Sequence, residues 1–100
     1  MTMKTYTICG SMRFELEMKE IAFMLETQKG FNILQCIYTH REVSEEEKQR
    51  LAAAHYRKID ISDGIYVVNI GGYIGESVAT EIDYAKNQGK EIYYHCKNNE

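Results

Sequence analysis

Two hydrophobic periods alternate along the chain, and they predict strands and helices in turn. Four short runs are rich in β-branched and aromatic residues, as β-strands are: residues 5–9, 31–38, 64–70 and 91–95. The run at 64–70 is almost continuously apolar, which is typical of a parallel strand covered on both faces. Between the runs, apolar residues recur at helical spacing, as at Met18, Ile21 and Leu25.

Three helices are expected between the strands, at about residues 12–29, 45–58 and 76–88. Ser11 can cap the first helix, because its hydroxyl can accept from backbone N–H groups one turn on. Ser44 and Glu47 form a capping box in front of the second helix. Gly30 and Gly89 follow the first and third helices, where a glycine commonly ends a helix.

The order of elements, β-α-β-α-β-α-β, predicts one α/β domain over residues 1–100. Right-handed crossovers make the sheet parallel and place helices on both of its faces. We expect a small open sheet with strand order 2-1-3-4, which is flavodoxin-like or Rossmann-like. In such sheets ligands bind beyond the carboxyl ends of the strands, where the strand order reverses, here between the first and third strands.

The turn after the first strand is one candidate binding segment and consists of Gly10, Ser11, Met12 and Arg13. Gly10 allows a ligand close to the backbone, and the start of the next helix offers unpaired N–H groups. Ser11 and Arg13 add a hydroxyl and a guanidinium, which both bind phosphate well. The alternative is structural: the glycine turns the chain, the serine caps, and the arginine is solvated.

The segment after the third strand faces the same edge and supplies Asn69, Gly75 and Ser77 as candidate binding residues. Ser77 and Glu81 are four residues apart and share a helix face. A carboxylate at Glu81 could attack the anomeric carbon of a sugar. The alternative is an ordinary acidic residue that interacts with the helix dipole, which is the commoner role of a glutamate at this place in a helix.

An aspartate, three cysteines and three histidines are the other residues that could take part in chemistry. Asp63 precedes the third strand, where it could act in a site or simply make a turn. Cys9, Cys36 and Cys96 form no CxxC pair, and the three histidines have no metal-ligand spacing. We therefore expect reduced thiols, no metal and no cofactor.

Composition narrows the classes of partner. The formal net charge is −3, which disfavours a nucleic-acid partner. No apolar run approaches the roughly 20 residues that a membrane span requires, so no membrane association is expected. Residues 1–5 show no secretory signal, and a cytoplasmic location is expected by default.

These segments together resemble the nucleoside 2-deoxyribosyltransferase superfamily, and more closely its 2′-deoxynucleoside 5′-monophosphate N-glycosidases. Residues 8–13 (ICGSMR) are similar to the phosphate-binding turn of the glycosidases, and residues 61–68 to the third strand of the family. Residues 75–85 are similar to its last motif, a small-residue loop leading to Glu-x-Gly-x-Ala, and the pair 89–90 to its glycine-lysine turn. The resemblance spans nearly the whole chain except about residues 38–56.

The resemblance implies roles for five residues. Glu81 would be the nucleophile that attacks C1′, and Asp63 would orient the sugar hydroxyls or the base. Ser11 and Arg13 would bind a 5′-phosphate, with Ser77 as a helper. Members often complete one another's sites, so a homodimer or higher homo-oligomer is expected.

Three positions depart from the family pattern. Thr7 replaces a tyrosine that helps to position the nucleophile, Asp83 replaces the motif glycine, and Gly75 replaces an Asp or Ser. The function expected is cleavage or transfer of the N-glycosidic bond of a (deoxy)nucleoside or its 5′-monophosphate. The alternatives are a non-catalytic module that binds a nucleotide derivative and a ligand-free oligomerising scaffold.

Overall fold

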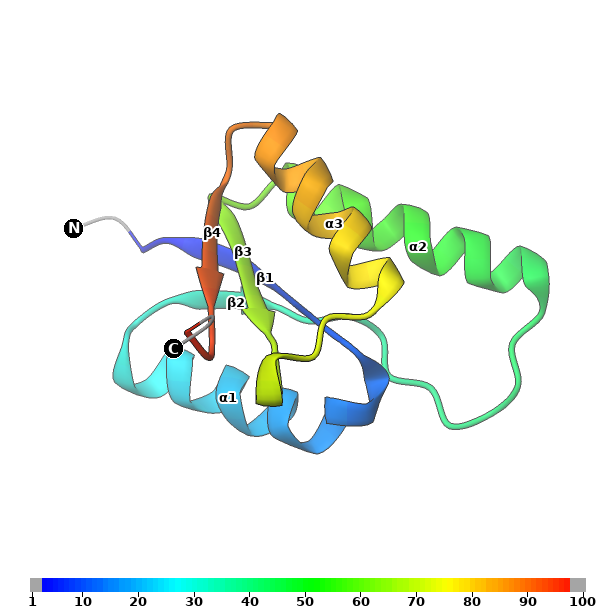
Figure 1. The fold of residues 1–100 in the computed structure, drawn as a ribbon, viewed down its shortest axis with the longest axis horizontal. Helices are drawn as coiled ribbons and strands as arrows, with labels where there is room; N and C mark the ends of the chain where they lie inside the picture. The colour runs from blue at the N-terminus through cyan, green and yellow to red at the C-terminus, as the bar shows by residue number, and fades with distance from the viewer. Residues whose placement is uncertain (1–2, 98–100) are drawn as a thin grey trace.

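The computed structural model describes residues 3–97 and contains a four-stranded parallel sheet (Figure 1). Its strands are β1 (Thr5–Gly10), β2 (Asn32–Leu34), β3 (Gly64–Val68) and β4 (Glu91–Tyr94). The order β2-β1-β3-β4 confirms the 2-1-3-4 prediction, and every pairing is parallel. Gly10 pairs with Val68, so the central strands β1 and β3 end together at one edge of the sheet.

Helices cover both faces of this sheet, as expected (Figure 1). α1 (Glu15–Gln28) packs on one face, and α2 (Glu45–Asp60) and α3 (Glu76–Asn87) pack on the other. The core on the α1 face contains Tyr6, Ile8, Met18, Ile21, Ala22, Leu25, Ile33 and Val68. The core on the other face contains Cys9, Ile59, Ile65, Val67, Val78, Ile82 and Ala85. Within residues 3–97, no helix combines the length and the apolar character that crossing a bilayer would require.

The helix caps follow the sequence signals with one difference. The Ser44 and Glu47 capping box is present at the start of α2, with both reciprocal hydrogen bonds formed. Ser11 caps a short 3₁₀ turn, η1 (Met12–Phe14), rather than α1 itself, and its Oγ accepts from the Arg13 N–H at 3.3 Å. The first α-helix therefore begins at Glu15, three residues after the turn starts.

The second strand is much shorter than the predicted run at 31–38. Only Asn32–Leu34 pair with β1. The Lys58 ammonium donates to the carbonyl oxygen of Gln35 at 2.8 Å, so a side chain satisfies an acceptor that a longer strand would have given to its neighbour. The chain then leaves the sheet and runs irregularly to Ser44.

The third strand also ends early, at Val68 instead of residue 70. The side chain of Asn69 donates to the Cys96 carbonyl oxygen at 2.9 Å and accepts from the Cys96 N–H at 2.8 Å. Beyond it lies a second 3₁₀ turn, η2 (Ile70–Gly72). Gly71 and Gly72 there have φ angles of 66° and 80°, which other L-residues rarely adopt. The turn directs the chain away from the sheet toward α3.

Candidate functional site

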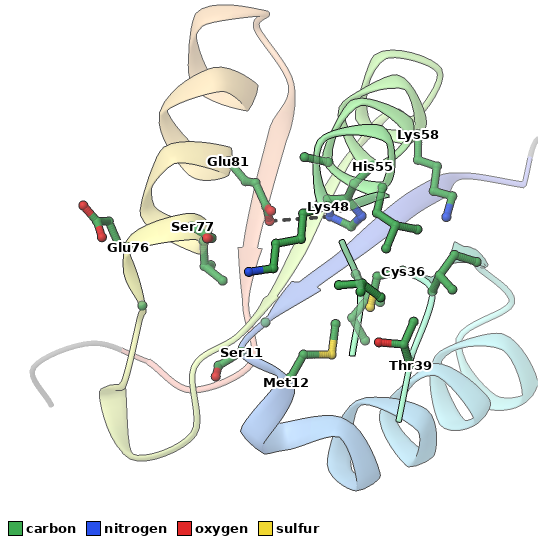
Figure 2. A pocket seen from close by; sticks show the side chains of 18 of the residues that line it. Ser11, Met12, Cys36, Thr39, Lys48, His55, Lys58, Glu76, Ser77 and Glu81 are labelled. Carbon is green, nitrogen blue, oxygen red and sulfur yellow. Dashed lines mark ion pairs between the residues drawn. The ribbon is translucent and has the colours of Figure 1, made fainter. Parts of the chain in front are cut away.

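A cavity of about 510 Å³ lies at the carboxyl edge of the sheet, where the strand order predicted a ligand (Figure 2). Its walls come from the turn after β1, the irregular segment after β2, one face of α2, and the start of α3 with its preceding loop. Pockets of about 300–1,000 Å³ accommodate small organic ligands. The cavity is therefore large enough for a nucleoside or its monophosphate.

Six of the nine predicted site residues line this cavity: Gly10, Ser11, Met12, Gly75, Ser77 and Glu81. They come from two segments that are far apart in sequence and that the parallel pairing of β1 with β3 brings together. Ser77 and Glu81 reach the cavity from successive turns of α3, as their spacing predicted.

Arg13 stands at the rim rather than in the cavity wall. Its guanidinium carbon lies 3.9 Å from the ring centroid of Tyr73, which itself lines the cavity. This is a cation–π contact, and it holds a positive charge beside the entrance.

Asn69 and Asp63 are not among the residues that line the cavity. Asn69 is buried, and its amide is used in the two hydrogen bonds to Cys96. Asp63 precedes β3 and so lies at the opposite, amino-terminal edge of the sheet, where its Oδ2 accepts from the Thr5 N–H at 2.8 Å. The Asn69 amide therefore joins the chain just after β3 to the chain just after β4, whereas the Asp63 carboxylate bonds at the other edge of the sheet.

No sequence motif pointed to the cavity wall formed by α2. Lys48, Leu51, Ala52 and His55 all line the cavity, and their spacing is that of one helix face. This spacing is visible in the sequence, but α2 has polar residues on most of its surface and no motif marks the relevant face. The ammonium of Lys48 forms no hydrogen bond or ion pair with residues 3–97, and Figure 2 shows Lys48 reaching into the cavity.

Glu81 and His55 meet at the inner end of the cavity (Figure 2). The Nε2 atom of His55 lies 3.5 Å from Oε1 of Glu81, and the exposed fractions of the two side chains are 11% and 16%. Because β1, α2 and α3 are packed together here, the carboxylate sits on a rigid helix yet still faces open space.

Cys9 lies beside this pair. Its Sγ is 3.5 Å from the same Nε2 of His55, and the thiol also faces the Thr7 carbonyl oxygen. Burial, followed by the negative charge of Glu81, raises the pKa of the Cys9 thiol well above its ordinary value. The thiol is therefore protonated at neutral pH, and a cysteine nucleophile is disfavoured.

The spacing of cysteines and histidines along the sequence did not indicate a metal site, yet the fold brings three potential ligands together. The ligand atoms of Cys9, His55 and Glu81 all lie within 4.8 Å of one another, which makes the group a possible metal site. The three residues lie on β1, α2 and α3, so only the tertiary fold brings them together.

The start of α3 contributes positive potential to the same cavity. Its N-cap, Gly75, has no side chain to satisfy the first N–H groups, and the first helical backbone bond is donated by Ala79. Free N–H groups at a helix N-terminus favour anions. Lys48 in the wall and Arg13 beside Tyr73 add positive charge, and the carboxylates of Glu76 and Glu81 add negative charge to the same wall.

No protein-family model, no curated protein and no solved structure matched this chain when it was compared with them.

Proposed function

We propose that this chain cleaves or transfers the N-glycosidic bond of a (deoxy)nucleoside or its 5′-monophosphate, with Glu81 as the nucleophile. The observation that carries the proposal is the position of Glu81. Its carboxylate lies at the inner end of a cavity of about 510 Å³, on a rigid helix and open to a ligand. The resemblance of residues 8–13 and 75–85 to the deoxyribosyltransferase superfamily supports the same chemistry.

The first step of the reaction needs one protein group, the carboxylate of Glu81. The Glu81 carboxylate attacks C1′ of the sugar, the bond from C1′ to the base nitrogen breaks, and the base leaves with the bonding electrons and takes up a proton from solvent. A covalent ester between the sugar and Glu81 results. Water then attacks C1′, breaks the ester and releases the free sugar, or a second base attacks C1′ in place of water and gives a new nucleoside. The first outcome is hydrolysis and the second is transfer.

We assign binding of a 5′-phosphate to the hydroxyl groups and positive charges of the same cavity. Ser11 and Ser77 offer hydroxyls, the start of α3 offers N–H groups, and Lys48 offers an ammonium without another partner in residues 3–97. Arg13 adds a charge at the rim. Asp63 has no part in this scheme, because it lies at the other edge of the sheet.

A second candidate function is a binding module without turnover. It is favoured by Thr7, which stands where the family has a tyrosine that helps to position the nucleophile. The Thr7 hydroxyl is fully buried and bonded to the Ser62 hydroxyl at 2.7 Å, so it cannot replace that tyrosine in the cavity.

A homo-oligomer forms part of the proposal. Leu16 and Phe23 on α1 are 79% and 63% exposed, and apolar surface of this kind favours burial against a second copy. Light scattering on the purified chain measures this directly, and a monomer at micromolar concentration would contradict it.

Liquid chromatography of reaction mixtures tests the activity. The purified chain is incubated with the four deoxynucleosides and their 5′-monophosphates, with and without a second free base. Release of base indicates a hydrolase, and base exchange indicates a transferase. Glu81→Gln should abolish either reaction, while calorimetry should still detect ligand binding. Asp83→Asn is the control: it makes the same change of charge at an exposed position on α3 and should keep the activity. If every substrate remains intact while calorimetry detects binding, the binding module is the correct function.

A further inference from the structure

The group formed by Cys9, His55 and Glu81 offers three different donor atoms to one point in space. The donors are a thiol sulfur, an imidazole nitrogen and a carboxylate oxygen, all within 4.8 Å of one another. Zn²⁺ binds these three ligand types, whereas Mg²⁺ and Ca²⁺ prefer oxygen alone. The donor set therefore selects a borderline-soft ion.

The two donor separations that involve the His55 nitrogen also fit a tetrahedral ion. Zinc bonds are about 2.3 Å to sulfur and about 2.0–2.1 Å to nitrogen and oxygen, so adjacent ligands stand roughly 3.3–3.6 Å apart. The observed distances are 3.5 Å from the Cys9 sulfur to His55 Nε2 and 3.5 Å from that nitrogen to Glu81 Oε1. Only small side-chain adjustments would be needed to enclose the ion.

The fourth position would be open. His55 and Glu81 line the cavity, whereas Cys9 is 1% exposed and lies behind them. An ion held by the three would face the cavity through its remaining position, where water can bind. Three protein ligands with one open position is the arrangement of an accessible zinc site rather than a closed structural one.

The surroundings of His55 indicate a reversible site. Nδ1 of His55 is buried and has no hydrogen-bond partner in residues 3–97. In most metal-binding histidines the second ring nitrogen donates a hydrogen bond to a partner. Loss of that partner typically weakens metal binding by about 10–100-fold. The ion would therefore exchange with solution instead of remaining permanently bound.

We propose that Cys9, His55 and Glu81 bind one Zn²⁺ ion reversibly, and that the bound ion blocks the carboxylate of Glu81. As the zinc–sulfur bond forms, the thiol proton passes to solvent. The carboxylate then donates its electrons to the metal and is no longer free to attack a sugar. The binding of zinc stands on the geometry alone, whereas the inhibition rests on the proposed function.

Cobalt spectroscopy tests the binding without any substrate. Co²⁺ added to the purified, reduced chain should give one equivalent of a tetrahedral visible spectrum with a thiolate-to-cobalt charge-transfer band, and Zn²⁺ should displace it. Cys9→Ala should remove the charge-transfer band, and His55→Ala and Glu81→Gln should each weaken binding by about tenfold or more. The matched control is the double variant Cys36→Ala, Cys96→Ala, which should keep both the band and the affinity. Circular dichroism verifies that each variant is folded.

The results distinguish the two proposals. Binding of cobalt by the Cys9→Ala variant with wild-type affinity, or loss of the band in the double variant alone, would overturn the zinc site. If the site binds zinc and the chain turns over a nucleotide, stoichiometric Zn²⁺ should lower the rate at least tenfold and a chelator should restore it. Full activity of the zinc-saturated protein would refute the inhibition and leave the binding intact. Absence of turnover with every substrate would refute the proposed function and leave the cobalt result unaffected.

Discussion

His55 and Glu81 lie 3.5 Å apart on two different helices, and they join the part of the site that the sequence suggested to the part that it concealed. Glu81 is on α3 and follows the loop that the sequence singled out, whereas His55 is on α2, where no motif indicated a site residue. The Nε2 atom of the imidazole lies beside one carboxylate oxygen, and both side chains are largely buried. We therefore expect His55 to position the carboxylate of the proposed nucleophile.

Replacement of His55 should lower kcat more than it changes KM. We expect His55→Asn to reduce kcat by about 10–100-fold, equivalent to about 1.4–2.7 kcal/mol of transition-state stabilisation. KM should change less than about threefold, because His55 is not among the groups assigned to the phosphate. Steady-state kinetics in the presence of a chelator, with a thermal melt of each variant, measures this. A rise in KM at unchanged kcat would indicate that His55 binds substrate instead of positioning Glu81.

Removal of the Lys48 charge should affect phosphorylated ligands selectively. Lys48→Ala should weaken binding of a 5′-monophosphate by about tenfold, since hydrogen bonds to charged groups contribute about 1.5–3 kcal/mol. Binding of the matching nucleoside should hardly change. Arg50→Ala on the same helix is the control. It removes the same single positive charge, but Arg50 is exposed and pairs with Glu46. Calorimetry with both ligands gives the comparison, and an equal loss for both would remove Lys48 from the phosphate site.

Gly64 should tolerate no side chain. A Cβ atom there would lie 2.4 Å from the Glu91 carbonyl oxygen, because β3 and β4 pair at this position. We expect Gly64→Ala to destabilise the fold by about 2–3 kcal/mol, with a fall in Tm of about 10 °C or more. Gly30→Ala is the comparison: its φ is +73° but nothing lies within 4 Å, so it should cost only about 1–2 kcal/mol. Similar melting temperatures for the two variants would contradict the steric explanation.

The fold should lose stability in acid partly through Glu91. Its two carboxylate oxygens accept from Lys4 Nζ at 2.8 Å and from the Tyr6 hydroxyl at 2.6 Å. These hydrogen bonds, with that of Lys4 the larger cause, lower the pKa of Glu91 below the ordinary 4.5. A group whose pKa is lowered by folding stabilises the fold above its unfolded pKa, and that stability is lost as the pH falls through the folded pKa.

Urea unfolding from pH 7 to pH 3 measures this contribution. Glu91→Gln should lower the urea midpoint at pH 7, and the gap to the wild type should narrow below about pH 4.5 as the wild-type carboxylate takes up a proton. Glu45→Gln, at the exposed start of α2, serves as the control for a general change in charge. A gap that stays constant down to pH 3 would show that the lowered pKa of Glu91 does not contribute.

The fold was predictable because its signals are local. The strand and helix periods, the capping box of Ser44 and Glu47, and the apolar third strand each depend on a few neighbouring residues, and together they imply the parallel sheet. The length of β2 was not predictable. Its apolar run continues after Leu34, but the partner of the next carbonyl is Lys58, which lies far along the chain.

The site residues were predictable only in the segments that follow the two central strands, β1 and β3. Residues 10–12 and 75–81 reach the cavity because parallel strands end together, which is a property of the topology. The contribution of α2 depends on which face of a mostly polar helix turns inward, and packing decides that. Asp63 was predicted as a site residue but does not line the cavity. It precedes the central strand β3 and so lies at the amino-terminal edge of the sheet, where it bonds to the Thr5 N–H.

The strand order has a consequence for the newly made chain as it leaves the ribosome. β1 emerges first, yet its neighbour β3 follows only after α1, β2 and α2 have been synthesised. During that interval β2 protects one side of β1, and the other side exposes unpaired backbone groups that could pair with another chain. Glu81 emerges later still, so no shorter nascent chain holds a complete cavity. A mutation that slows the docking of β3 should therefore reduce the yield of folded protein before it alters any property of the site.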